Sequence, residues 1–201
     1  LPIPDARLPM MRWITPIKQR RCLELQWYVP PLWQHHRAKP GDYVSHLLGH
    51  EGKGSCLAAL KAAGLADGLS AGVDTDEQTT AATMFAVSID LTPRGIEQIN
   101  AVAQLVFAEL GMLARREPEA WVYEEMRDVA ALRFRHMEQE EEVDYTRRLA
   151  ISLQQRLAPA ESLCGDCLLS EWDPELVRSI LAQLTPERVV AFVMAARPDD
   201  A

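Results

Sequence analysis

Two histidines, His46 and His50, have the clearest spacing for chemistry in this sequence. On a helix, residues four apart share a face, so two imidazoles could ligate the same metal ion. Gly49 stands between them and no acidic residue does, so the stretch offers no carboxylate to act as general base toward a metal-bound water. The pattern indicates the scaffold of a zinc-protease motif that has lost its chemistry.

A second candidate is the pair Cys164 and Cys167, whose spacing is typical of a redox pair or of half a zinc site. A zinc ribbon needs another such pair, but Cys22 and Cys56 are isolated. Two ordinary thiols in a loop or at a helix end are the favoured interpretation. A redox or metal protein built on these cysteines or on the two histidines stays open as an alternative.

Composition and charge restrict the class of protein. The chain has 201 residues, enough for one globular domain, and its net charge of −8 with scattered basic residues argues against nucleic acid or an anionic membrane as main partner. No apolar run reaches membrane-spanning length, and no signal-peptide pattern opens the chain. We therefore expect a cytoplasmic location by default, although the sequence does not specify the compartment.

The predicted domain organisation is a single domain between two linkers. The first residues of the chain resemble an interdomain linker cut from a larger protein, because they are rich in proline and begin with Leu1 rather than Met. We expect a linker and first strand over residues 1–15, one domain over 16–197 and a second linker over 198–201.

Period-two alternation and helix caps predict the strands and helices on which the two candidate motifs lie. Alternation predicts strands, and Ser, Thr or Asp followed by proline or a periodic apolar stripe predicts helix starts. Expected strands cover 10–15, 22–29, 68–74 (an edge strand rich in small residues), 79–91 and 188–196. Expected helices cover 40–51, 55–64, one helix from Thr92 to beyond Leu113, 118–134 with Val129 inward, 145–157 and one from Asp173.

Helices grouped between strands predict an α+β fold. We expect a largely antiparallel sheet covered on one face by a single layer of helices.

Four segments together resemble one known family, the insulin-degrading enzyme and pitrilysin zinc metallopeptidases. They are Gly49-His-Glu-Gly-Lys-Gly-Ser55, the small-residue stretch 68–72, Leu91-Thr-Pro-Arg-Gly95 and Leu184-Thr-Pro-Glu-Arg188. The resemblance extends from about residue 16 to residue 196 and is to the second domain of such enzymes, which is catalytically inactive.

The resemblance implies a metallopeptidase or mitochondrial processing peptidase-like α+β roll, one of four homologous domains around a chamber. Zinc and the motif H-x-x-E-H belong to the first domain. Here Gly49 replaces the glutamate of that motif, and Asp128 lies near where a distant third ligand would be expected. We therefore expect no catalytic residue, metal ligand or cofactor in this chain, zinc in the catalytic domain of the full-length protein, and no peptidase activity from the chain alone. Whether the full-length protein is an active enzyme stays open.

In relatives, this domain's inner wall forms an exosite that anchors the amino-terminal end of a peptide as an added strand. Carried over by position, the predicted exosite comprises His46, Gly49, Glu51, Leu69 and Ala71. Glu51 could pair with a terminal ammonium, and the methyl of Ala71 would narrow the groove. Expected partners are peptide substrates and other domains of the same polypeptide.

Relatives of this fold also serve as structural or silent partner subunits in processing-peptidase-like complexes. That role is the alternative function, although the glycine-rich stretch favours the peptidase branch.

Overall fold

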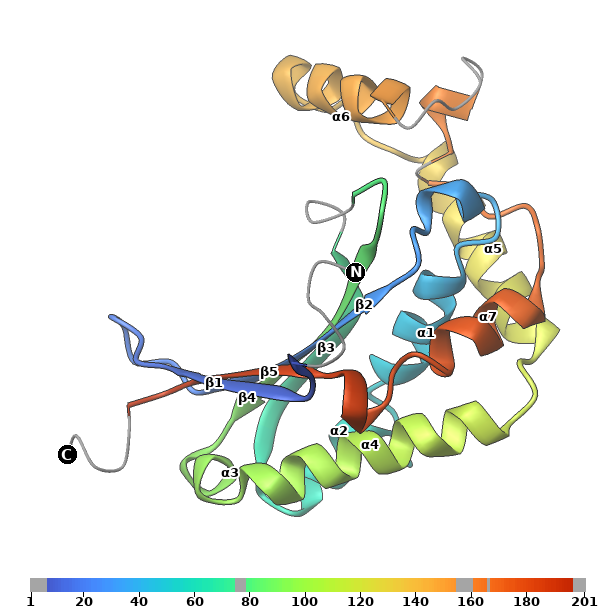
Figure 1. Cartoon of the computed structure of the whole chain (residues 1–201). Coiled ribbons are helices and arrows are strands. Elements are labelled where there is room, and N and C mark those ends of the chain that lie inside the picture. The colour runs from blue at the N-terminus through green and yellow to red at the C-terminus, as the bar shows by residue number, and fades with distance from the viewer. Residues whose placement is uncertain (1–6, 75–78, 155–160, 166, 197–201) are drawn as a thin grey trace.

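A five-stranded mixed sheet lies at the centre of the computed structural model, which describes residues 7–74, 79–154, 161–165 and 167–196 (Figure 1). The strand order is β1-β5-β2-β4-β3, so β3 and β1 are the two edges. β1 runs parallel to β5, and the other neighbours pair antiparallel. The strands are β1 Met10–Ile14, β2 Cys22–Val29, β3 Ala66–Asp74, β4 Thr83–Leu91 and β5 Val190–Met194.

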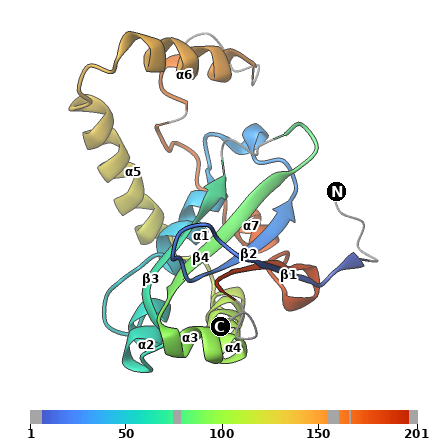
Figure 2. The same cartoon turned by 90° about the vertical axis from the view of Figure 1, so that its left-hand side faces the viewer.

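Helices α1, α2, α4 and α7 form a layer on one face of this sheet (Figures 1 and 2). This arrangement confirms the predicted α+β class with a largely antiparallel sheet. The helices are α1 Pro40–Leu48, α2 Cys56–Ala62, α3 Pro93–Glu97, α4 Ile99–Arg115, α5 Ala120–Arg135, α6 Glu142–Gln154 and α7 Pro174–Leu181, with 3-10 turns η2 Trp33–His35, η3 Glu161–Leu163 and η4 Pro186–Arg188.

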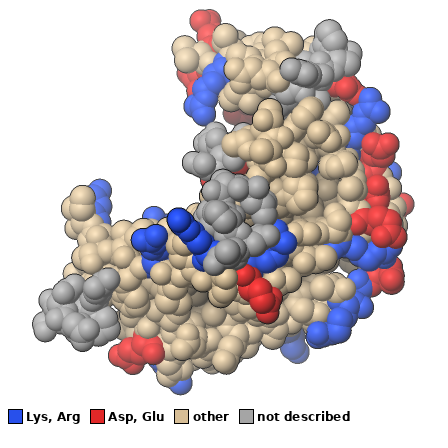
Figure 3. All heavy atoms as spheres, viewed as in Figure 1, with Lys and Arg blue, Asp and Glu red and all other residues tan. Residues whose placement is uncertain are grey.

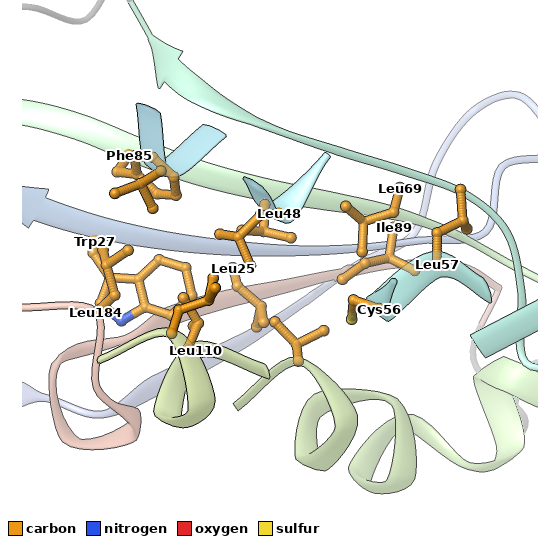
Figure 4. Close-up of a cluster of buried hydrophobic side chains, with 14 of the residues drawn as sticks. Leu25, Trp27, Leu48, Cys56, Leu57, Leu69, Phe85, Ile89, Leu110 and Leu184 are labelled. Carbon is orange, nitrogen blue, oxygen red and sulfur yellow. The ribbon is translucent and has the colours of Figure 1, made fainter. Parts of the chain in front are cut away.

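Alternate residues of the central strands and the apolar stripes of the helices build one core between the layers (Figure 4). Trp27 of β2 and Phe85 of β4 are fully buried. The Trp27 ring meets Phe107 of α4 edge-on, with centroids 6.2 Å apart, and its Nε1 donates to the Thr185 carbonyl at 2.9 Å. The only polar atom of the largest core side chain is thereby paired.

Three helix starts confirm the caps that the sequence predicted. The hydroxyls of Ser55 and Thr92 accept from backbone N–H groups of Ala58 and Gly95, and the Asp173 carboxylate accepts from the first turn of α7. The single long helix expected after Thr92 is wrong, because the chain leaves helical geometry at Gln98 (φ −120°, ψ 38°). Two separate constraints explain the break: the Thr92 cap and the close packing of Gly95 on Leu65 hold α3, whereas the apolar stripe of α4 lies on the core.

Other element boundaries differ from the predictions. The helix expected over 40–51 ends at Leu48, and β4 begins at Thr83 because Thr79 instead closes a turn with Ala82. The last strand is also shorter than expected, since η4 occupies residues 186–188. The helix expected over 145–157 is α6, which begins at Glu142; residues 155–157 lie outside the described part.

The chain beyond the middle of α5 leaves the sheet, and we call residues 127–154, the rest of α5 together with α6, the arm (Figures 1 and 2). Figure 3 shows α6 standing apart above a broad hollow. Val129, predicted to point inward, is 40% exposed, whereas its neighbour Ala130 packs against the core. No helix in the described residues is long and apolar enough to cross a bilayer.

Candidate functional site

The prediction that His46 and His50 lie on one face of a helix is wrong. α1 ends at Leu48, where the N–H of Gly49 donates to the Ser45 carbonyl at 2.8 Å, so His50 lies past the helix end. Its imidazole bends back over Gly52, where any Cβ would overlap the ring nitrogen Nε2. Both histidines are solvent-exposed. The glycine at position 52 thus accommodates a side chain of its own loop.

No group of three or more His, Cys, Asp or Glu side chains is placed to hold a metal ion among the described residues. Asp128, which the resemblance placed near a third ligand position, is exposed on α5 and forms an ion pair with its neighbour Arg127 at 3.0 Å. The structure therefore does not join Asp128 to His46 and His50 in a common site.

His46 instead lines a groove of about 740 Å³ between α1, the end of β3 and α5. Its walls are mostly apolar, with charged groups at both sides. The lining residues are Lys39, Asp42, Ser45, His46, Gly72, Val73, Glu125, Met126, Val129, Ala130, Arg133, Phe134, Met137, Cys167 and Leu169.

One glycine determines how closely the first two walls of this groove approach each other. Gly41, in the first turn of α1, lies against Val73 of β3, and a Cβ at Gly41 would overlap the Val73 side chain. Lys39 precedes the helix in left-handed backbone (φ 44°), and Pro40 begins it. In the sequence, Pro40 and Gly41 mark only the start of a helix, and nothing shows which strand the glycine contacts.

The third wall comes from α5. Tyr43 of α1 fixes its start, since the Tyr43 hydroxyl accepts from the Glu119 N–H at 2.8 Å. Met126, Val129, Ala130 and Phe134 then follow at helical spacing along the groove. α5 is therefore divided: Val122 and Tyr123 are buried, and the following turns, with Val129 that was predicted to point inward, line the groove.

Charges in the groove have both signs. Asp42 is reached by solvent, but the surrounding walls reduce its hydration, which raises the pKa of its carboxyl, whereas the charge of Lys39 acts in the opposite direction. Glu125 and Arg133 lie on α5 across from α1. Such a site can pair with a cationic or an anionic group while burying apolar surface.

The edge strand β3 opens into this groove. Gly72 and Val73 line it, and the outer edge of β3 has no strand partner among the described residues. The side chains of Leu69 and Ala71 face the core: Leu69 is 9% exposed, and Ala71 packs against the buried cluster. At these two predicted exosite positions, only the main chain is therefore available along the edge.

The remaining predicted positions, Gly49 and Glu51, follow α1 and do not line the groove. Glu51 is exposed. A second hollow of about 410 Å³ lies on the other side of His46, between the ends of α1 and α4 and the start of α5, and His50 and Trp121 are among its walls. Of the five predicted exosite residues, His46 alone contributes a side chain to the larger groove.

Comparison with known proteins identifies the family. The model "Peptidase M16 inactive domain" matches residues 8–129, which carry the sheet edge, α1 and most of α5. The chain belongs to the M16 peptidase family. A second family model, "Middle or third domain of peptidase_M16", matches residues 134–200, so the two models meet inside α5.

The chain is also similar to part of several known peptidases. The M16 inactive domain is 38% identical to human nardilysin over 178 residues, which is 87% of this chain and 15% of that protein. It is 32% identical to the insulin-degrading enzyme of Drosophila melanogaster over 200 residues, 98% of this chain and 20% of that protein. The chain thus spans a fifth or less of the length of these relatives.

The fold of the M16 inactive domain also matches solved structures. A crystal structure of pitrilysin superposes with a TM-score of 0.90 at 22% identity, covering 97% of this chain and 21% of that one. These findings confirm the predicted resemblance to an inactive domain of the insulin-degrading enzyme and pitrilysin family. The predicted linker and domain limits stay predictions.

Proposed function

We propose that this M16 inactive domain anchors extended peptides for a larger zinc metallopeptidase, at the edge of β3 and in the groove beside it. The observation that carries the proposal is the position of the β3 edge, which pairs with no other strand of the described residues, at the mouth of a largely apolar groove. In the full-length protein this surface would form part of the chamber wall and serve as the exosite.

An edge strand binds a peptide through main-chain hydrogen bonds, so affinity depends little on the peptide's sequence. The side chains of Leu69 and Ala71 face the core and leave the main chain of β3 to make these bonds. The groove's volume of about 740 Å³ could then hold apolar side chains of the peptide against Val129 and Phe134.

Acidic groups would favour binding of a positively charged group, such as the terminal ammonium of the peptide. Asp42 and Glu125 line the groove, and either could pair with a terminal ammonium or a basic side chain. Glu51, the residue predicted for this role, lies outside the groove on the segment that follows α1. We therefore propose Asp42 and Glu125 as first partners for the ammonium and Glu51 as a more distant one.

Peptide cleavage would belong to another domain. Gly49 occupies the position where the H-x-x-E-H motif has its glutamate, so this chain has no general base beside His46 and His50. Zinc and the catalytic residues are expected in the catalytic domain of the full-length protein, since this chain spans only 15 to 20% of its relatives.

Peptide binding can be tested with a matched pair of substitutions on α5. Val129 lines the groove, whereas Leu132, on the same helix, is not among the lining residues; both are exposed aliphatic side chains. With a fluorescent unstructured peptide and anisotropy as readout, Val129→Asp should raise Kd about tenfold, because it replaces apolar surface in the groove by a hydrated carboxylate that a bound apolar side chain would have to desolvate. Leu132→Asp should leave Kd unchanged. Equal effects of the two substitutions would exclude the groove.

Catalytic inactivity is tested separately with a fluorogenic peptide and added zinc. We expect no hydrolysis by this chain. Zinc-dependent turnover that His46→Ala abolishes would contradict the assignment.

A further inference from the structure

Cys164 and Cys167 lie in a tight turn that neither the groove nor the family assignment explains. The carbonyl of Cys164 accepts from the N–H of Cys167 at 3.0 Å and from that of Leu168 at 2.9 Å. The preceding turn is closed by the Glu161 carbonyl, which accepts from the Cys164 N–H at 3.1 Å. These hydrogen bonds hold the backbone N–H of Cys167 next to the carbonyl of Cys164.

The same turn is attached to the protein on both sides through Arg37. The Arg37 guanidinium donates to the Glu161 carboxylate, with Nε 2.8 Å from Oε1. On the other side, the Arg37 carbonyl accepts from the Ser170 N–H at 2.9 Å and from the Tyr123 hydroxyl at 3.1 Å. Leu169 is buried between these attachments.

Thiol accessibility divides the four cysteines into two pairs. Cys22 and Cys56 are buried; the Cys22 sulfur lies 3.2 Å from the Ser88 hydroxyl, and burial raises the pKa of Cys56 to about 11. Cys164 and Cys167 are partly exposed. Since the thiolate is the reacting species, exchange with a reagent in solution should select the second pair.

We propose that Cys164 and Cys167 form a reversible dithiol–disulfide pair that exchanges with low-molecular-weight disulfides such as oxidised glutathione. A disulfide needs Cα atoms about 4.4–6.8 Å apart. A turn closed by a hydrogen bond from its fourth residue to its first keeps these atoms within about 7 Å. The separation that this hydrogen bond imposes overlaps the range that a disulfide requires.

The chemistry balances without any further reactant. One cysteine loses its thiol proton and attacks a sulfur of oxidised glutathione, whose S–S bond breaks and releases one glutathione thiol. The second cysteine then attacks the mixed disulfide at the protein sulfur and releases the second glutathione. Two cysteine S–H bonds become one intramolecular S–S bond, and two electrons reduce one glutathione disulfide to two thiols.

Cys167 also lines the large groove, beside Leu169. The redox pair would therefore border the proposed peptide-binding surface. The exchange itself does not require that the groove bind a peptide, so failure of the proposed function would leave the redox proposal standing.

The test uses the whole chain equilibrated in glutathione redox buffers, quenched with an alkylating reagent, and analysed by intact and peptide mass spectrometry. We expect Cys164 and Cys167 to lose both alkyl groups together, the oxidised chain to be two hydrogens lighter than the unalkylated dithiol chain, and dithiothreitol to restore both thiols. At a fixed concentration of oxidised glutathione, the ratio of oxidised to reduced chain should fall with the square of the reduced glutathione concentration, since two glutathione thiols are released.

Single substitutions distinguish the pair from two independent thiols. Cys164→Ser and Cys167→Ser should each leave one glutathione adduct that persists until a reductant is added, whereas Cys56→Ala should leave the exchange unchanged. Separate glutathione adducts on both cysteines of the unsubstituted chain, a disulfide that includes Cys22 or Cys56, or retention of both thiols in oxidising buffer would each overturn the proposal.

Discussion

The sheet body and the arm both contain helices with apolar stripes, but these stripes are buried in the body and largely exposed in the arm. By the body we mean β1 to β5 with α1 to α4 and α7, whose apolar side chains form one continuous core. In α6 of the arm, Val143 is 78% exposed and Leu153 is 59% exposed. An amphipathic stripe is buried only where another element covers it, so periodicity alone does not determine burial.

Electrostatic contacts within the arm are correspondingly local. Arg148 of α6 pairs with Glu140 at 3.1 Å and lies 5.3 Å from the centre of the Tyr145 ring. Both partners of this ion pair are partly exposed to solvent, and surface ion pairs contribute little to the free energy of unfolding. The stability of the chain should therefore reside in the body. Four substitutions, two of them with a matched control substitution, measure the difference between the two regions.

The largest loss of stability should come from Trp27→Ala. The substitution empties a fully buried site, removes the contact with Phe107 and leaves the Thr185 carbonyl without its donor. We expect a cost of about 3–5 kcal/mol in the free energy of unfolding, measured by urea denaturation monitored by circular dichroism. If Trp27→Ala cost less than Leu132→Ala in the arm, the body would not be the more stabilising region.

Gly95→Ala should be the next most damaging. A Cβ at this position would overlap the Leu65 carbonyl oxygen, a backbone atom that also accepts from the Thr92 N–H at 3.1 Å. We expect about 1–3 kcal/mol of destabilisation in the same assay.

A matched glycine substitution controls for helix propensity. At Gly111 of α4, a Cβ would meet only the end of the Arg115 side chain, at 3.5 Å. Gly111→Ala should therefore stabilise the protein by about 0.5–1 kcal/mol. If alanine stabilised the protein at both positions, the contact with Leu65 would not exclude a Cβ at position 95.

Thr92→Ala should have a smaller effect, about 0.5–2 kcal/mol. It removes the helix cap on the Gly95 N–H and the hydrogen bond from the Thr92 hydroxyl to the Gly64 carbonyl at 2.8 Å. Thr92→Ser retains both bonds and should recover most of the loss, which thermal denaturation of the two variants would measure.

The smallest effect should come from the arm. Leu132 is 57% exposed, so Leu132→Ala should change the free energy of unfolding by less than about 0.5 kcal/mol. A loss of several kcal/mol in the urea assay would mean that the arm packs against the body in solution.

Local sequence signals predicted most of the body. The alternation in 22–29 gave β2 its bounds, and the three capping residues marked helix starts as expected. These features depend on residues a few positions apart. The break at Gln98 and the exposure of Val129 could not be predicted in this way, because each depends on where a distant element ends or packs.

The candidate site was predicted only in outline. His46 was identified, and the neighbouring residues of β3 were placed on an edge strand. The opposite wall was missed because Val129 and Phe134 are more than fifty residues from β3 in the chain, and their spacing is the same as that of a core stripe. His50 was assigned to the helix because four-residue spacing cannot show that α1 stops at Leu48.

The sequence alone determined the class of the fold and the absence of an acid at position 49. Strand alternation, helix caps and side-chain chemistry depend on the type of a residue and on neighbours a few positions away in the chain. Tertiary structure alone decided that Gly41 meets Val73 and that α5 passes from the core to the groove. Such contacts join segments far apart in the chain, and which segments meet depends on how all the layers pack together.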